Sequence, residues 1–140
     1  MRQKGVVFST ALSMTQCADV FRHAAQAARG PGAMIGEFAA KLRGNDHSGF
    51  FTPTFDSPFA AVDRVPDFAV GAYIGKLIGG GDGAGTAVHM YVDDKAERRD
   101  VQIVSPHTLT GGMRSARLAR TIFDAFQSAD PRLVVTDGNL

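Results

Sequence analysis

The sequence predicts an α+β fold, in which an antiparallel β-sheet carries helices packed on one face and the elements follow the order β-α-α-β(3-4)-α. Apolar residues recur at helical spacing over about residues 14–29 and again over about 111–128. Between these helices, residues 68–105 contain three stretches of alternating polarity joined by close connections. Strands grouped together after helices favour an antiparallel sheet with segregated helices.

The N-terminal part begins with a strand that leads into a helix. Residues 5–12, GVVFSTAL, alternate in polarity as a half-buried strand does. Ser13 and Gln16 then have the spacing of a capping box, in which each side chain accepts a hydrogen bond from the backbone N–H of the other residue. We therefore expect an amphipathic helix that begins at about residue 14.

A Gly-Pro-Gly sequence at residues 30–32 predicts the end of this first helix, because proline lacks a backbone N–H and glycine favours a change of direction. A second, shorter helix is expected over about 33–43, where apolar residues again share one face. Its interior Gly36 costs about 1 kcal/mol relative to alanine.

Residues 45–67 have the weakest pattern, whereas the residues that follow read as strands. The sequence GFFTPTF predicts a strand that Pro53 restricts to a sheet edge or a bulge. Alternation over 68–78, 85–92 and 101–105 predicts three further strands, the last two joined by the charged turn DDKAERRD. Two close connections in succession imply an antiparallel meander.

The C-terminal part contains an amphipathic helix and a short apolar segment. The helix is expected over about 111–128, with its apolar side on the sheet. Residues 130–140 form either an edge strand or a flexible tail. A length of 140 residues corresponds to one ordinary domain, so we expect residues 1–140 to form a single domain.

The glycine-rich stretch at residues 79–85 invites a phosphate-binding interpretation. A P-loop needs a lysine and a helix after its glycines, and a dinucleotide-binding loop also needs a helix there. A strand is expected directly after Gly85. A calcium-binding repeat is also excluded, because it needs an aspartate at the position that Gly85 occupies. We therefore interpret it as a hairpin connection, in which glycine supplies positive φ.

Composition and charge exclude several classes of function. The 15 lysine and arginine residues nearly balance the 14 acidic residues, so the chain lacks a field that attracts nucleic acid or an anionic membrane. No apolar run approaches the roughly 20 residues of a transmembrane helix. Cys17, the single cysteine, excludes an internal disulfide and a thiolate zinc site. A lone thiol suits a reducing compartment, and we expect a cytoplasmic protein without a cofactor.

His89 and Tyr91 are the strongest candidates for chemistry. They lie two residues apart on a predicted strand and share one face, so they could form an acid-base pair, with His47 or His107 joining them. No two histidines have a local metal-ligand spacing. We expect no metal site and rank an enzyme that uses His89 and Tyr91 last among three hypotheses.

The predicted order of elements resembles that of helix-grip folds of the lipid-transfer and pollen-allergen type, which wrap a sheet around a long C-terminal helix and often enclose an apolar ligand. It is similar also to a TATA-binding-protein-like sheet with two helices. We expect a non-catalytic domain that binds an apolar or amphipathic small molecule between the C-terminal helix and the sheet. The residues expected to contact that molecule are Phe50, Phe51, Phe55, Tyr73, His89, Tyr91 and Phe126. The alternative is a homodimer that pairs through an edge strand or an aromatic arm.

Overall fold

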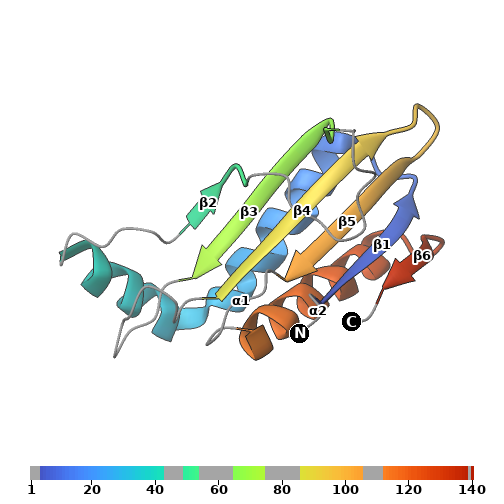
Figure 1. The fold of residues 1–140 in the computed structure, drawn as a ribbon. Helices are drawn as coiled ribbons and strands as arrows, with labels where there is room; N and C mark the ends of the chain where they lie inside the picture. Colours follow the sequence, from blue (N-terminus) through green and yellow to red (C-terminus); the bar gives the residue numbers. More distant parts are fainter. Residues whose placement is uncertain (1–3, 43–48, 54–64, 75–85, 106–111, 139) are drawn as a thin grey trace.

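The computed structural model describes residues 4–42, 49–53, 65–74, 86–105, 112–138 and 140, and over 29–42 it describes the backbone alone. These residues form two helices and six strands, which are labelled in Figure 1. In chain order these elements are β1 (Lys4–Thr10), α1 (Met14–Leu42), β2 (Gly49–Phe51), β3 (Phe68–Ile74), β4 (Thr86–Asp94), β5 (Arg99–Ser105), α2 (Gly112–Ala129) and β6 (Val134–Gly138).

All six strands form one sheet in the order β2-β3-β4-β5-β1-β6, and every neighbouring pair is antiparallel. The predicted α+β class, the antiparallel sheet and the β3-β4-β5 meander are therefore confirmed. The strand β2, which precedes Pro53, lies at one edge, as expected of a strand next to proline. The other edge is β6, so the segment after residue 130 forms an edge strand. Self-association through such an edge stays a prediction.

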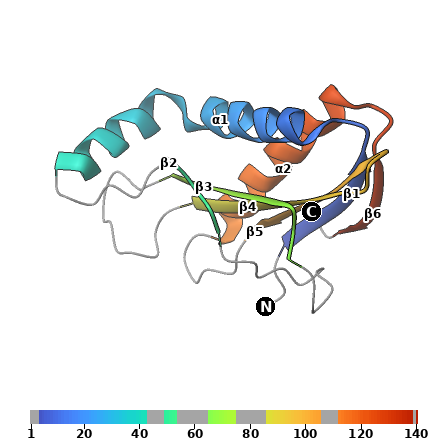
Figure 2. The same cartoon turned by 90° about the horizontal axis from the view of Figure 1, so that it is seen from above.

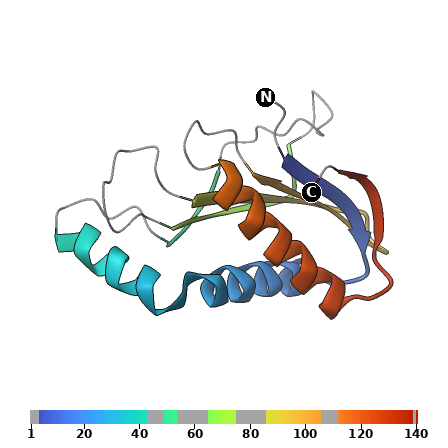
Figure 3. The same ribbon diagram turned by 90° about the horizontal axis from the view of Figure 1, so that it is seen from below.

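Both helices cover the same face of the sheet (Figures 2 and 3). Helix α2 packs on β4 and β5, and α1 packs on β3 and against α2. The first half of α1 contributes Cys17, Phe21 and Ala25 to the core, and one side of α2 contributes Leu118, Ala119, Ile122, Phe123 and Phe126. We call the sheet surface under the helices the inner face and the opposite surface the outer face.

The predicted capping box at the start of α1 is confirmed. The backbone N–H of Ser13 donates to Gln16 Oε1 at 2.8 Å, and the backbone N–H of Gln16 donates to Ser13 Oγ at 3.1 Å. Two donors that lack partners within the helix are thereby satisfied, which fixes where α1 begins.

The prediction of two helices separated at residues 30–32 is wrong, because α1 continues from Met14 to Leu42. Pro31 therefore lies inside a helix, where it removes one backbone hydrogen bond and bends the axis instead of ending the helix. Figure 2 shows α1 changing direction partway along its length. The element order is accordingly β-α-β-β-β-β-α-β, with one helix before the β2–β5 strands and one after them.

Several predicted features lie outside the described residues. They include the glycine-rich stretch at 79–85, most of the irregular segment at 45–67, Phe55, His47 and His107. Over the described part of the chain, neither helix combines the length and apolarity needed to cross a membrane.

Candidate ligand-binding site

The alternation of β4 divides its side chains between the two faces of the sheet. Val88, Met90 and Val92 have no exposed surface and belong to the core under the helices. Because successive side chains of a strand point to opposite faces, His89 and Tyr91 lie on the outer face. The sequence prediction that these two residues share a face is confirmed by their contact, since His89 Nδ1 and Tyr91 Oη are 3.1 Å apart.

Strand β2 brings a phenylalanine onto the same outer face. The ring of Phe51 meets the ring of His89 edge-on, with centroids 5.5 Å apart and planes at 82°. The rings of His89 and Tyr91 are also nearly perpendicular, with centroids 6.1 Å apart. We call Phe51, His89 and Tyr91 the aromatic cluster.

Gly71 makes the contact between β2 and β4 possible. The register pairs Phe51 with Gly71 and Gly71 with His89, so the three residues form a row across β2, β3 and β4. A Cβ atom at residue 71 would overlap the Phe51 ring, with Cε2 at 2.7 Å and Cε1 at 2.8 Å. The phenylalanine side chain therefore fills the space that glycine leaves and spans β3 to reach His89, as aromatic residues do when they cover a glycine in a sheet.

Burial differs strongly within the aromatic cluster. Phe51 is 40% exposed, whereas Tyr91 is only 1% exposed and His89 is half-buried. The buried Tyr91 is hydrogen-bonded through its hydroxyl group to His89, whereas the ring of Phe51 is partly exposed to solvent. A half-buried histidine beside an exposed ring is suited to a molecule that carries both an apolar and a polar group.

Two of the other residues predicted to contact a ligand, Phe50 and Phe126, lie away from the outer face. Phe50 points to the inner face, where its ring centroid is 6.3 Å from that of Phe21. Phe126 is fully buried in α2, with its ring centroid 5.1 Å from that of Phe8. Tyr73 is half-buried on β3, and alternation places it on the same face as Gly71. The structure therefore brings together three of the seven residues, and Phe55 lies outside the described residues.

The described residues offer little for metal or thiol chemistry. They contain no group of three His, Cys, Asp or Glu side chains that could hold a metal ion. Burial raises the pKa of the Cys17 thiol to about 11, and the nearby Arg99 opposes that shift. A thiol with this pKa is almost entirely protonated at neutral pH and is a poor nucleophile. Cys17 therefore packs α1 against the core.

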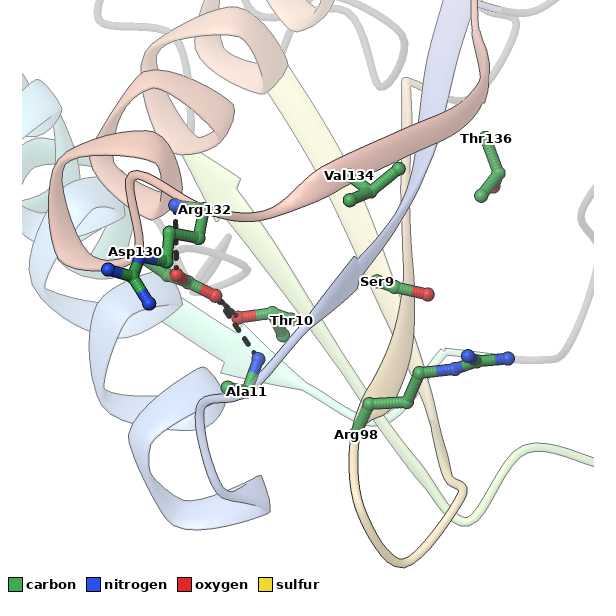
Figure 4. A pocket seen from close by; sticks show the side chains of 8 residues that line it. All are labelled: Ser9, Thr10, Ala11, Arg98, Asp130, Arg132, Val134 and Thr136. Carbon is green, nitrogen blue, oxygen red and sulfur yellow. Dashed lines mark hydrogen bonds between the residues drawn. The ribbon is translucent and has the colours of Figure 1, made fainter.

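Sequence reasoning missed a pocket of about 430 Å³ at the end of β1. Its walls come from the end of β1, the β4–β5 turn, the α2–β6 turn and β6 (Figure 4). These segments are separated by up to about the full length of the chain, so no local pattern marks the pocket. The Asp130-Pro131 sequence, which is typical of a turn, was the only signal nearby.

Comparisons of the chain with protein-family models, with curated proteins and with solved structures give no match.

Proposed function

We propose that this chain is a non-catalytic binding domain whose aromatic cluster contacts an apolar or amphipathic small molecule on the outer face of β2, β3 and β4. The observation that carries this proposal is the Phe51 ring, which is 40% exposed although it is held in place by Gly71 and His89. An aromatic ring that stays fixed while exposed loses little conformational entropy when a ligand packs on it.

The outer face suits a ligand better than the interface between α2 and the sheet. At that interface Phe126 packs on Phe8, and neither side chain has exposed surface. A ligand there would have to separate two core side chains, whose contacts each contribute several kcal/mol to stability. Contact with Phe51 on the outer face requires no such displacement.

The aromatic cluster also indicates the chemistry of the ligand. An aromatic or flat apolar group would pack on the Phe51 ring, where offset or edge-to-face contact contributes about 0.5–1.5 kcal/mol beyond the area buried. A polar group on the same molecule would lie near the hydrogen-bonded His89–Tyr91 pair. We infer an amphipathic molecule with one ring-sized apolar part.

We also propose that the fold resembles a TATA-binding-protein-like sheet with two helices more closely than a helix-grip fold. One helix precedes and one follows β2–β5, and both cover the same face. Helix α2 has 18 residues, which is short for a helix around which a sheet wraps. This resemblance concerns the fold and supports no activity, because one fold hosts many functions.

The proposal is tested by native mass spectrometry of freshly purified protein, which detects a co-purified ligand, followed by titration with the amphipathic fluorescent probe anilinonaphthalene sulfonate. Phe51→Ala should weaken probe binding roughly tenfold, which corresponds to the loss of about 1.4 kcal/mol of ring contact. Phe50→Ala is the matched control, since Phe50 is the adjacent residue, is 36% exposed and points to the inner face.

An unchanged affinity in Phe51→Ala, or an equal loss in Phe50→Ala, would reject the aromatic cluster as the binding surface. Thermal unfolding of both variants shows whether either substitution acts by loosening β2 from the sheet.

A further inference from the structure

The pocket of about 430 Å³ lies beside β1 and β6, at the edge of the sheet opposite to β2 and the aromatic cluster (Figure 4). Its volume falls within the range of small-molecule sites, about 300–1,000 Å³. It is therefore large enough for a small organic ligand and is separate from the surface proposed above.

A β-bulge shapes one wall of this pocket. The β1–β6 register pairs Val7 with Asp137 but Phe8 with Val135, which leaves Thr136 as the extra residue on β6. Its Oγ1 donates to the carbonyl oxygen of Val7 at 3.2 Å. A bulge redirects side chains and occurs often beside functional sites, and here it accompanies the opening between β1 and β6.

The carboxylate in the pocket wall is already satisfied by the protein. Asp130 Oδ2 accepts from Thr10 Oγ1 at 2.7 Å and from the backbone N–H of Ala11 at 3.1 Å, and its Oδ1 accepts from the backbone N–H of Arg132 at 3.1 Å. Figure 4 shows these three contacts gathered at one end of the pocket. Asp130 therefore has a structural role, and a ligand would be contacted by other residues of the pocket.

Two arginines flank the opening from different segments. Arg98, from the β4–β5 turn, is 64% exposed in its side chain, and its Nε lies 3.6 Å from Asp100 Oδ1. Asp100 also accepts from Ser9 Oγ at 2.8 Å. Arg132 lies in the α2–β6 turn and is exposed. Figure 4 shows the two guanidinium groups on opposite sides of the pocket, each directed away from the space between them.

Formal charge balances in this region, because Arg98 and Arg132 offset Asp100 and Asp130. Recognition would therefore depend on the directed N–H groups of the two guanidinium groups rather than on a net field. Exposed arginine side chains change rotamer within nanoseconds, so both can turn toward a bound anion.

We propose that this pocket binds a small organic phosphate, with Arg98 and Arg132 donating to the phosphate oxygens and Val134 contacting the organic part. A tetrahedral phosphate offers oxygens in several directions, whereas a carboxylate offers one edge, so a phosphate can accept from two arginines that turn inward from different segments. Val134 lines the same pocket and is 60% exposed, which provides an apolar surface beside the two cations.

The test is a titration of the full-length protein with phenyl phosphate, followed by amide chemical shifts at constant ionic strength. Saturable shifts are expected at the end of β1, in the two turns and in β6. Arg98→Gln and Arg132→Gln should each weaken binding roughly tenfold, the equivalent of one charge-assisted hydrogen bond.

Arg120→Gln is the matched control. Arg120 lies on α2, is 57% exposed in its side chain and has its Nε 3.3 Å from Asp124 Oδ1, which closely parallels Arg98 and Asp100. This variant should bind phenyl phosphate as the unmodified protein does. Val134→Thr should weaken phenyl phosphate while leaving inorganic phosphate unchanged.

The proposal would be overturned if phenyl phosphate produced no saturable shift. It would also be overturned if Arg120→Gln lost as much affinity as Arg98→Gln, or if acetate bound as tightly as phosphate. Phe51→Ala should leave this titration unchanged, so its outcome is independent of the aromatic-cluster proposal.

Discussion

At the scale of single residues, Asp130 links the end of β1 to the turn between α2 and β6. Its carboxylate accepts hydrogen bonds from the end of β1 and from the turn that leaves α2. Leu133 closes the same turn by donating its backbone N–H to the carbonyl oxygen of Asp130 at 3.2 Å. One half-buried side chain therefore sets how α2 connects to the edge of the sheet.

Asp130→Asn should lower the free energy of unfolding by about 1–2 kcal/mol at neutral pH, because in either orientation the amide places its NH₂ group against a backbone N–H, that of Ala11 or that of Arg132. The hydrogen bond from Thr10, with smaller contributions from Ala11 and Arg132, lowers the pKa of Asp130 below its ordinary 3.8. Its stabilisation is therefore complete above pH 3.8 and is lost as pH falls through the lower, folded-state pKa.

Urea unfolding at pH 7 and between pH 5 and 2 measures this effect. The difference between Asp130→Asn and the unmodified protein should shrink in acid. Asp124→Asn is the control, because Asp124 pairs only with Arg120 on the exposed side of α2 among the described contacts. A difference that stays constant down to pH 2 would contradict the assigned role.

Residue-level predictions succeeded where the responsible contact is local. The Ser13–Gln16 capping box spans one helical turn, so the two residues that form it are close in the sequence. The contact of Phe51 with Gly71 was not predictable, because it depends on which residues of β2 and β3 pair.

At the scale of elements, α1 shows where local signals mislead. Glycine and proline at 30–32 predict a helix end, yet α1 continues to Leu42. Helix propensity is a weak signal that neighbouring packing overrides, and a proline inside a helix is tolerated when the axis bends. The strands β3, β4 and β5 were easier to predict, because their side chains alternate between the inner and outer faces and this period of two residues is visible in the sequence.

Pro31→Ala should stabilise the protein by up to about 3 kcal/mol and increase its helical circular dichroism, because it restores a backbone N–H inside α1. Pro131→Ala is the matched control in a turn, where proline already suits the backbone. That variant should lose about 0.4–1 kcal/mol. Unchanged stability and helicity in Pro31→Ala would indicate that the helix ends near residue 30 after all.

At the scale of the whole molecule, the fold is a sheet with one face covered by two helices (Figures 2 and 3). Phe8 stands at the centre of that arrangement, because its ring contacts Phe123 and Phe126 with centroids 5.5 and 5.1 Å apart. β1 is the first strand of the chain but lies between β5 and β6, so Phe8 connects the sheet interior to the last helix.

Phe8→Ala should lower the free energy of unfolding by about 3–5 kcal/mol, since it removes a fully buried ring and leaves a cavity between α2 and the sheet. Val135→Ala, on the exposed edge strand β6, should change stability by less than about 0.5 kcal/mol. Chemical unfolding followed by circular dichroism measures both. Comparable losses in the two variants would show that the inner face is not the main core.

The sequence by itself determined the class of the fold, the antiparallel meander and the two amphipathic helices, because periods of 3.6 and 2 residues are local properties of the chain. Tertiary structure alone decided the continuity of α1, the place of β1 between β5 and β6, the row of Phe51, Gly71 and His89, and the pocket at the end of β1. The physical reason is sequence separation. The contacts that build this pocket join residues as far apart as Val7 and Thr136, 129 positions along the chain, and no local pattern records such a pairing.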